Sequence, residues 1–210
     1  VDVDNHIVVS KRQGFPCKIY QINIPSHDDD ARVYINGTNV WQHLGGCCDA
    51  HTNIWTGYLD ANSTIEYRHA EGGGGSNQEI TFTDVTTALN GGSIAGITNG
   101  TTICTGGDPG AFTSTTSGSG GTIGIANGSP SAETYQWESS TTSSTTGYSN
   151  IGGATSTTYD PGALTATTWF RRRVTDACGT VSYSNVIQVV VVADPAAPTA
   201  TKSPAVTTVC

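Results

Sequence analysis

Residues 18–43 read KIYQINIPSHDDDARVYINGTNVWQH, and this stretch decides the fold class of the first half of the chain. Apolar and polar residues alternate on both sides of three consecutive aspartates, as they do in strands that bury one face. Asn36 and Gly37 favour a tight turn between two antiparallel strands. We therefore expect strands at residues 18–25 and 31–37, with the chain turning back after the second strand.

Strand-like stretches recur along the whole chain. No segment shows the 3.6-residue apolar period of a long helix, and Gly, Ser, Thr and Asn dominate the composition. Tyr, Trp, Val and Ile, which favour strands, are scattered between them. The sequence therefore predicts an all-β protein. Its further expected strands are residues 6–15, 63–71, 78–85, 133–140, 167–176 and 184–192.

The charge balance is acidic, with 9 Lys and Arg against 17 Asp and Glu and a net charge of −8. Proteins that bind nucleic acid need a basic face, so we expect no nucleic-acid partner. An acidic chain is also simply a soluble one, which explains the charge equally well. The apolar run at residues 186–193 suits a strand and is too short to span a membrane, so we expect no membrane insertion.

The six cysteines form no CxxC pair. Small β proteins with little apolar core use disulfides for stability in oxidising compartments. We favour this interpretation over buried reduced thiols, and we expect a secreted protein at the cell surface or in an extracellular filament. The cysteines expected in disulfides are Cys17, Cys47, Cys48, Cys104 and Cys178, with the partners of Cys47 and Cys48 left open.

Histidines beside the adjacent cysteines raise a second possibility. By residue type, His43, Cys47, Cys48 and His51 could form a zinc site. Adjacent cysteines rarely both face one metal ion, and the expected compartment is oxidising. We therefore favour disulfides over zinc here.

The two halves of the chain differ in amino-acid composition. Residues 1–86 contain all five histidines and most of the charge, whereas the sequence from about residue 93 onward is rich in Thr, Ser and Gly. We expect one domain at 1–86, a second at 87–193, and a proline-containing linker at 194–210. The last ten residues echo residues 97–104, each stretch ending in cysteine, which indicates the start of a further repeat.

Two family resemblances rest on longer stretches. The stretches YQINIPSHDDDARVYINGTNVW and TGYLDANSTIEYRHAEGGGGSNQEITF resemble the second half of a PA14-type β-sandwich, which implies a module truncated at its N-terminus. ICTGGDPGAFTST, YQWESS and IGGATSTTYDPGALTATTWFRRRVTDACGTVSYSNVIQV resemble the Ig-like repeats of large Bacteroidetes surface adhesins linked to gliding and type IX secretion. Together the resemblances imply two β-sandwich domains in tandem.

The aspartates suggest an ion site. Adjacent carboxylates on one short loop repel each other, and Ca²⁺, which takes six to eight oxygen ligands, would cancel that repulsion. A solvated turn capped by Asp28 is the alternative interpretation. The PA14 resemblance implies that Asp29 and Asp30, joined by a cis peptide bond, hold Ca²⁺ together with Asn77 or Gln78 from the glycine-rich loop.

Other residues near these loops are candidates for contact with a sugar. The four consecutive glycines before Ser76 let a backbone approach an ion or a sugar closely. Tryptophan rings can form a sugar-binding platform, although half-buried tryptophans are more common. The expected ligand-binding residues are Asp28, Gly73, Gly74, Ser76, Trp41 and Trp55.

We expect no enzymatic activity. Ser26, His27 and Asp28 contain the residue types of a catalytic triad, but three adjacent side chains cannot point at one another. We expect an extracellular adhesin fragment whose first module binds a polysaccharide or cell-surface glycan in a calcium-dependent manner, with the Ig-like repeat as a stalk. Two alternatives are a filament subunit that binds only copies of itself through β-strand contacts, and an accessory domain of a carbohydrate-active enzyme.

Overall fold

The computed structural model describes residues 6–46, 48–96, 101–124 and 133–194. The prediction of an all-β protein is confirmed, since these residues form strands and no helix. None of them therefore belongs to an apolar helix long enough to cross a membrane. The chain separates into two compact units, with Val1–Ala88 and Gly120–Ala132 in unit 1 and Leu89–Ser119 and Glu133–Cys210 in unit 2.

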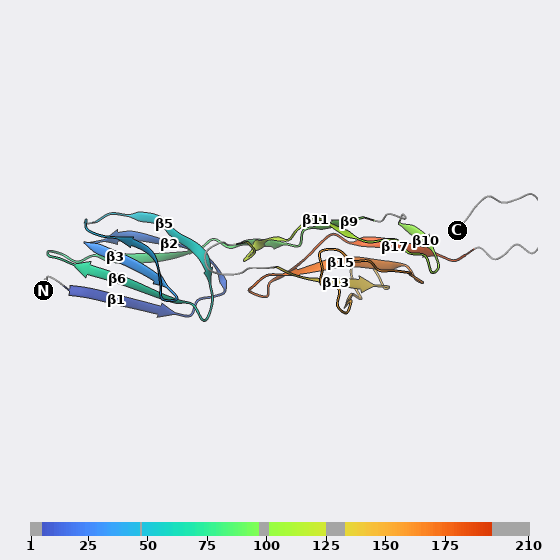
Figure 1. Cartoon of the computed structure of the whole chain (residues 1–210), viewed down its shortest axis with the longest axis horizontal. Helices are drawn as coiled ribbons and strands as arrows, with labels where there is room; N and C mark the ends of the chain where they lie inside the picture. Colours follow the sequence, from blue (N-terminus) through green and yellow to red (C-terminus); the bar gives the residue numbers. More distant parts are fainter. Residues whose placement is uncertain (1–5, 47, 97–100, 125–132, 195–210) are drawn as a thin grey trace, which may run out of the picture. The chain divides into compact units, whose positions relative to one another are not determined.

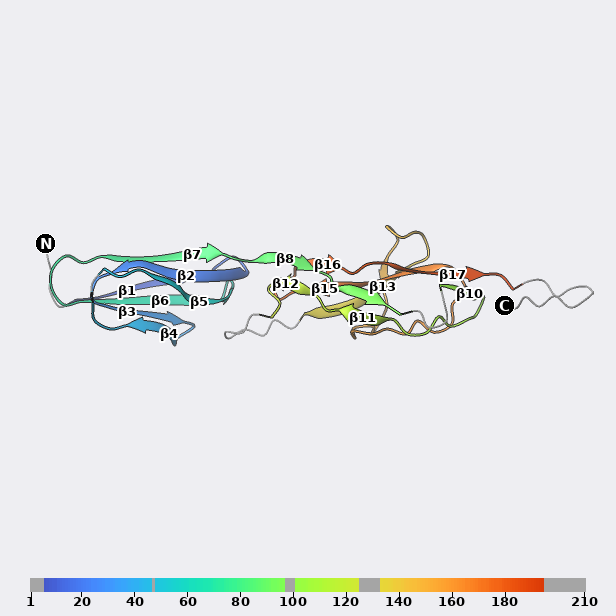
Figure 2. The same ribbon diagram turned by 90° about the horizontal axis from the view of Figure 1, so that it is seen from above.

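Unit 1 contains two antiparallel sheets, one with the strand order β1-β6-β3-β4 and the other with the order β5-β2-β7 (Figure 1). Strand β7 runs antiparallel beside β2 (Figure 2). The strands are β1 His6–Gln13, β2 Lys18–His27, β3 Asp30–Ile35, β4 Thr38–His43, β5 His51–Leu59, β6 Thr64–Glu71 and β7 Gln78–Asp84.

The alternation around the aspartates buries one face of each strand. Ile22 and Ile24 of β2 and Val33 of β3 have no exposed surface, and they pack into one apolar core with Leu59 of β5. Side chains of both sheets contribute to this core, so unit 1 is a two-layer sandwich. Each such buried aliphatic side chain contributes about 1.5–3 kcal/mol to folding.

The expected hairpin is present between β3 and β4. Asn36 and Gly37 both have positive φ values, 48° and 80°, and Ile35 pairs with Thr38 across them. A two-residue turn with two positive φ values has the backbone twist that antiparallel strands need, and Asn-Gly adopts it at low cost. The turn thereby sets which residues of β3 face the core.

The strand boundaries around the aspartates differ from the expected ones. Strand β2 continues to His27, because Ser26 and His27 pair with Glu79 and Gln78 of β7. Strand β3 begins at Asp30, which pairs with Ala70 of β6. Only two of the three aspartates therefore lie between strands.

Unit 2 has a main sheet with the order β10-β17-β15-β13-β14, to which β16 adds beside β15, and a small sheet formed by β9 and β11. Strands β10 and β17 are parallel, and the other pairs of the main sheet are antiparallel. The strands are β9 Ser93–Ala95, β10 Thr102–Cys104, β11 Thr113–Thr116, β13 Thr134–Ser140, β14 Ser149–Asn150, β15 Thr168–Thr175, β16 Val181–Tyr183 and β17 Ile187–Val192. The short strands β8 Thr87–Asn90 and β12 Ser119–Gly121 complete the chain's strands.

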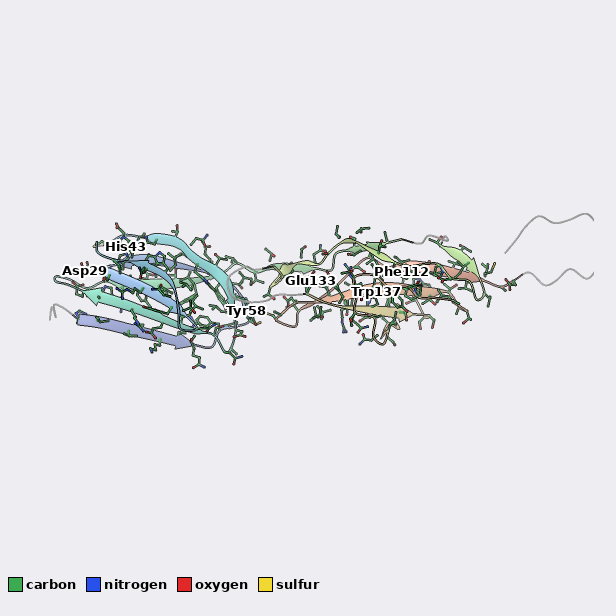
Figure 3. All side chains as sticks on the ribbon, viewed as in Figure 1. Asp29, His43, Tyr58, Phe112, Glu133 and Trp137 are labelled. Carbon is green, nitrogen blue, oxygen red and sulfur yellow. The ribbon has the colours of Figure 1, made fainter. Side chains whose placement is uncertain are left out.

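The core of unit 2 is centred on Trp137, which is fully buried among Phe112, Phe170 and Val189. Figure 3 shows the side chains of Phe112 and Trp137 inside this unit. The indole Nε1–H donates a hydrogen bond of 2.9 Å to the carbonyl of Ser156, so the ring is buried without leaving its polar atom unsatisfied.

Strand β15 places three consecutive arginines on alternating faces. Arg171 and Arg173 share one face, where both form ion pairs with the buried carboxylate of Glu138. Arg172 points to the other face and is fully buried, and it donates a hydrogen bond of 3.1 Å to the carbonyl of Thr116. Alternation along β15 therefore divides the three arginines between two faces, and side chains or carbonyls of unit 2 contact them on both faces.

The four described cysteines expected in disulfides, Cys17, Cys48, Cys104 and Cys178, are all disulfide-bonded. No free cysteine is found in the described part of the chain. The fifth, Cys47, lies outside the described residues. Disulfides are consistent with an extracellular location.

Candidate metal-binding sites

Several side chains of unit 1 that could bind a metal ion lie at one end of the unit. Asp29 and His43 both lie there, whereas Tyr58 lies at the opposite end of the unit (Figure 3). Two groups with the composition of a metal site occur at this end, one of carboxylates and one of imidazoles.

The first group, the carboxylate cluster, consists of Asp28, Asp29 and Glu71. One carboxylate oxygen from each residue lies within 4.8 Å of the others. The two aspartates connect β2 to β3, and Glu71 is the last residue of β6. The pairing of Asp30 with Ala70 explains this meeting, because it places the start of β3 beside the end of β6.

Backbone contacts hold the aspartate turn in place. Asp29 has a φ of 57°, a left-handed conformation that non-glycine residues seldom adopt. The N–H of Asp28 donates to the carbonyl of Asn77 over 2.9 Å, and the buried His69 donates through Nε2 to the carbonyl of Asp28. The carboxylate of Asp29 accepts a hydrogen bond from the N–H of Gly72.

Glycine is needed at position 72 for that last contact. A Cβ atom added to Gly72 would lie 2.9 Å from Oδ2 of Asp29, which is closer than real Cβ contacts allow. The absence of a side chain therefore lets the carboxylate reach the backbone.

Glu71 is the unusual member of the carboxylate cluster. Its side chain is buried, with only 3% of the residue exposed. Oε1 accepts a hydrogen bond of 2.8 Å from the N–H of Gly73, but Oε2 is buried and has no hydrogen-bond partner among the described residues. A buried carboxylate oxygen without a partner is costly, and two further carboxylates beside it add repulsion.

The structure brings together some of the predicted ligands and separates others. Asp29, an expected ion ligand, and Asp28, an expected ligand-binding residue, belong to the carboxylate cluster. Asp30 turns away: its Oδ1 accepts from the N–H of Gly45 over 2.6 Å. The expected cis bond between Asp29 and Asp30 is wrong, since no described peptide bond is cis.

Asn77 meets the aspartate turn through its backbone, since its carbonyl accepts the hydrogen bond from the N–H of Asp28 over 2.9 Å. The side-chain oxygen of Asn77 accepts from the hydroxyl of Ser26 over 3.3 Å, and Gln78 pairs with His27 in the ladder between β2 and β7. Sequence reasoning missed Glu71, although its position directly before four glycines was a usable signal.

Some of the residues predicted to contact a sugar are exposed, and one of them is buried. Gly73, Gly74 and Ser76 are exposed in the loop that follows Glu71. Trp55 is a core residue of unit 1 with 8% of its surface exposed, so its expected role in a surface platform is wrong. Its ring lies against Gly57, where an added Cβ would come within 2.3 Å of it.

The second group, the histidine cluster, consists of His27, His43 and His51. One ring nitrogen from each histidine lies within 4.8 Å of the others. His27 ends β2, His43 ends β4 and His51 begins β5. The half-buried ring of Trp41 lies beside them, 5.0 Å from the ring of His51 between centroids.

Hydrogen bonds define the protonation of His27. Its Nδ1 lies 3.0 Å from the carbonyl oxygen of Asp29, which can only accept, so Nδ1 carries the proton. In the neutral ring Nε2 then presents its lone pair, and this atom lies 3.0 Å from Nε2 of His51. Burial lowers the pKa of His27 and favours this neutral form, while the hydrogen bond to Asp29 opposes the shift.

The zinc site considered from sequence is only partly assembled. His43 and His51 meet, but their partner is His27 and not a thiolate. Cys48 is disulfide-bonded, so its sulfur is not available as a thiolate ligand in the oxidised protein. Sequence reasoning missed His27 in this role, because only the pairing of β2 with β5 brings it near His51.

Comparisons with known proteins give limited information. Residues 90–193 match a family model described as a domain of unknown function, DUF8696. No curated protein matches the chain.

Among solved structures, the chain is similar to a β-1,2-glucanase from Parabacteroides distasonis, with 8% identity and a TM-score of 0.30 over 86% of this chain and 28% of that one. It is also similar to a β-glucuronidase from Ruminococcus gnavus in complex with D-glucaro-d-lactam, with 9% identity and a TM-score of 0.26 over 86% of this chain and 36% of the other. The chain thus spans about a third of the length of these enzymes. Similarity at this level says nothing about the activity of the chain.

Proposed function

We propose that unit 1 is a calcium-dependent binding module of an extracellular adhesin and that Asp28, Asp29 and Glu71 hold the ion. The buried Oε2 of Glu71 carries this proposal, because it has no protein partner among the described residues and lies beside two further carboxylates. A divalent cation would satisfy that oxygen and remove the repulsion among the three groups. Oxygen ligands of this kind suit Ca²⁺.

The ligand we propose is a polysaccharide or a cell-surface glycan. The cluster brings together one oxygen from each of three carboxylates, fewer than the six to eight ligands that Ca²⁺ takes, so positions remain for water or sugar hydroxyls. Gly73 and Gly74 are exposed beside Glu71, where a short backbone loop without side chains leaves room for a sugar ring. The resemblance to PA14-type modules supports the same assignment.

Unit 2 is proposed as a stalk with no catalytic role. Its long paired strands, its Trp137 core and its resemblance to Ig-like adhesin repeats support this assignment. Disulfides in the chain, which persist in oxidising surroundings, support a secreted protein at the cell surface or in an extracellular filament.

Calorimetric titration of Ca²⁺ into the disulfide-intact chain tests the proposal. We expect saturable binding by the wild type, and loss of that binding in Glu71→Gln and Asp29→Asn. Asp30→Asn is the matched control, since it removes the same charge from the adjacent residue, which begins β3 and lies outside the carboxylate cluster. No binding by the folded wild type, or loss of binding only in Asp30→Asn, would overturn the assignment.

A glycan array then tests the sugar. We expect binding in Ca²⁺ that disappears with EDTA and in Glu71→Gln. Calcium binding without any glycan signal would reduce the ion to a structural role and contradict the carbohydrate part of the proposal.

One observation favours the filament subunit as a second candidate. Strand β1 is at the end of its sheet, and its Ile7 and Val9 are 70% and 47% exposed. An exposed apolar edge strand can pair with a strand of another copy. Sedimentation velocity of the wild type and of Ile7→Lys decides this: assembly that the variant loses supports the filament, and monomers at all concentrations exclude it.

A further inference from the structure

We propose that His27, His43 and His51 form a second, independent metal site that binds Zn²⁺. The histidine cluster uses nitrogen donors, which suit zinc and other transition metals, whereas the carboxylate cluster uses the oxygen donors that suit calcium. Unit 1 would then hold two ions of different chemistry at one end. This inference does not depend on the calcium proposal, because it stands on different side chains.

The spacing of the nitrogens fits a small ion. Two imidazole nitrogens that bind one tetrahedral Zn²⁺ at about 2.0–2.1 Å lie roughly 3.3 Å apart. Nε2 of His27 and Nε2 of His51 are 3.0 Å apart, and the nitrogens of all three residues lie within 4.8 Å of one another. Small movements of the half-buried His43 and His51 would bring the three donors around one ion.

The surroundings of His27 are those of a metal ligand. Metal-binding histidines commonly donate their second ring N–H to a carbonyl or carboxylate, which fixes the tautomer and aims the free nitrogen at the ion. His27 does this through its contact of 3.0 Å with the carbonyl of Asp29, and its ring is fully buried. The lone pair of Nε2 is thereby directed toward His51.

His43 also has a buried ring nitrogen that no described residue satisfies, which supports a bound ligand at this cluster. Its Nδ1 is buried and has no hydrogen-bond partner among the described residues. A hydrogen-bonded pair of histidines would account for His27 and His51 alone. It does not account for the third ring, whose centroid lies 4.7 Å from that of His51 and 5.0 Å from that of His27.

Three histidine ligands leave one coordination position of a tetrahedral ion open. Asp49 lies in the loop beside His43, since its Oδ2 would lie 4.0 Å from a Cβ atom added to Gly46, but its carboxylate does not belong to the histidine cluster. The same added atom would lie 3.4 Å from Cε1 of His43. Water is therefore the expected fourth ligand.

Cobalt titration of the oxidised full-length chain tests the site, because Co²⁺ replaces Zn²⁺ and reports tetrahedral nitrogen coordination in its visible absorption. We expect one equivalent of Co²⁺ to produce this absorption and Zn²⁺ to displace it. His43→Ala and His51→Ala are the informative variants, because both residues are half-buried, whereas removal of the fully buried His27 is expected to disturb folding.

We expect each of these two variants to weaken Co²⁺ binding by at least about tenfold while retaining the circular dichroism spectrum and any Ca²⁺ binding of the wild type. His6→Ala is the matched histidine control, and Glu71→Gln removes the carboxylate cluster without touching an imidazole; both should retain the absorption. No tetrahedral absorption in the wild type, or absorption unchanged in both His43→Ala and His51→Ala, would overturn the zinc site. Loss of absorption in Glu71→Gln alone would show that cobalt occupies the carboxylate cluster and would likewise overturn it.

Discussion

Each unit of the chain buries a glutamate, and the two differ in how the charge is compensated. In unit 2, Oε2 of Glu138 accepts from Nε of Arg171 over 2.8 Å, and Oε1 lies 3.4 Å from Arg173. In unit 1, Glu71 lies beside two aspartates and one of its oxygens has no partner among the described residues. The first carboxylate is neutralised by arginines of its own unit, whereas we propose that a bound cation neutralises the second.

The two units also differ in the surroundings of their buried basic side chains, Arg172 in unit 2 and the histidine cluster in unit 1. Arg172 of unit 2 is fully buried, and it contacts the carbonyl of Thr116 and the ring of Tyr135, whose centroid lies 4.3 Å from the guanidinium carbon, although its Nε has no hydrogen-bond partner among the described residues. The three imidazoles of unit 1 instead face one another. Arg172 is a single group, whereas the three imidazoles bring one nitrogen each to the same place, which is the arrangement expected of a ligand site.

The largest expected change in stability comes from removing the charge of Glu138, the carboxylate that is paired with two arginines. Glu138→Gln leaves Arg171 and Arg173 without their counter-charge in a partly buried site, so we expect a loss of about 3 kcal/mol in the free energy of unfolding of unit 2. Urea denaturation followed by circular dichroism measures it. The loss should be the same with Ca²⁺ and with EDTA, and a calcium-dependent loss would contradict the division between the two units.

The next effect is the stabilisation of unit 1 by calcium. At a free Ca²⁺ concentration of about 100 times the Kd, binding to the native state alone adds about 2.7 kcal/mol to the free energy of unfolding. Glu71→Gln should lose this gain, and in EDTA it should be at least as stable as the wild type because a repelling charge is gone. A variant that is much less stable than the wild type in EDTA would show that Glu71 is a structural residue and not an ion ligand.

A smaller effect, on calcium affinity, is expected from substituting Gly72, whose backbone contacts the carboxylate of Asp29. Gly72→Ala places a Cβ atom 2.9 Å from Oδ2 of Asp29, so the carboxylate must move and the calcium affinity should fall about tenfold, or ~1.4 kcal/mol. Gly75→Ala is the matched control in the same loop, because no atom lies within 4 Å of its added Cβ. Equal affinities of the two variants in calorimetry would remove Asp29 from the site.

The smallest expected change in stability concerns the exposed ion pair between Lys18 and Asp84. Lys18 and a hydrogen bond from Thr86 lower the pKa of Asp84 to about 2, below its ordinary value near 3.8. The folded state therefore favours the ionised form, and this stabilisation is complete above about pH 4 and disappears as the pH falls toward 2. Asp84→Asn should lower the thermal midpoint slightly at pH 7 and not at all below pH 2. A difference that grows as the pH falls would contradict the sign of this shift.

Local patterns in the sequence predicted the strands that follow a strict alternation. Asn36 and Gly37 identified the hairpin between β3 and β4. The strand β5 was missed, because its first three residues, His51 to Asn53, are polar and do not alternate. Its membership in the sheet is decided by pairing with β2, a contact between residues far apart in the chain.

The sites were harder to predict than the strands. The aspartate turn was recognised from three like charges in a row, but the third ligand, Glu71, comes from β6 and is brought near by the pairing of β3 with β6. Asp30 was expected to bind the ion, and instead the pleat of β3 directs its carboxylate to Gly45. A one-residue shift along a strand reverses the side-chain direction, and sequence position alone does not resolve it.

A crystal structure of the chain grown with Ca²⁺, with anomalous difference density used to locate the ion, tests the central claim most directly. We expect one calcium ion bound by carboxylate oxygens of Asp28, Asp29 and Glu71 at about 2.3–2.6 Å, with Oε2 of Glu71 among the ligands. Calcium bound by Asp30 and Asn77 in place of Glu71, or a water molecule on Oε2 of Glu71 with no ion nearby at saturating Ca²⁺, would contradict it.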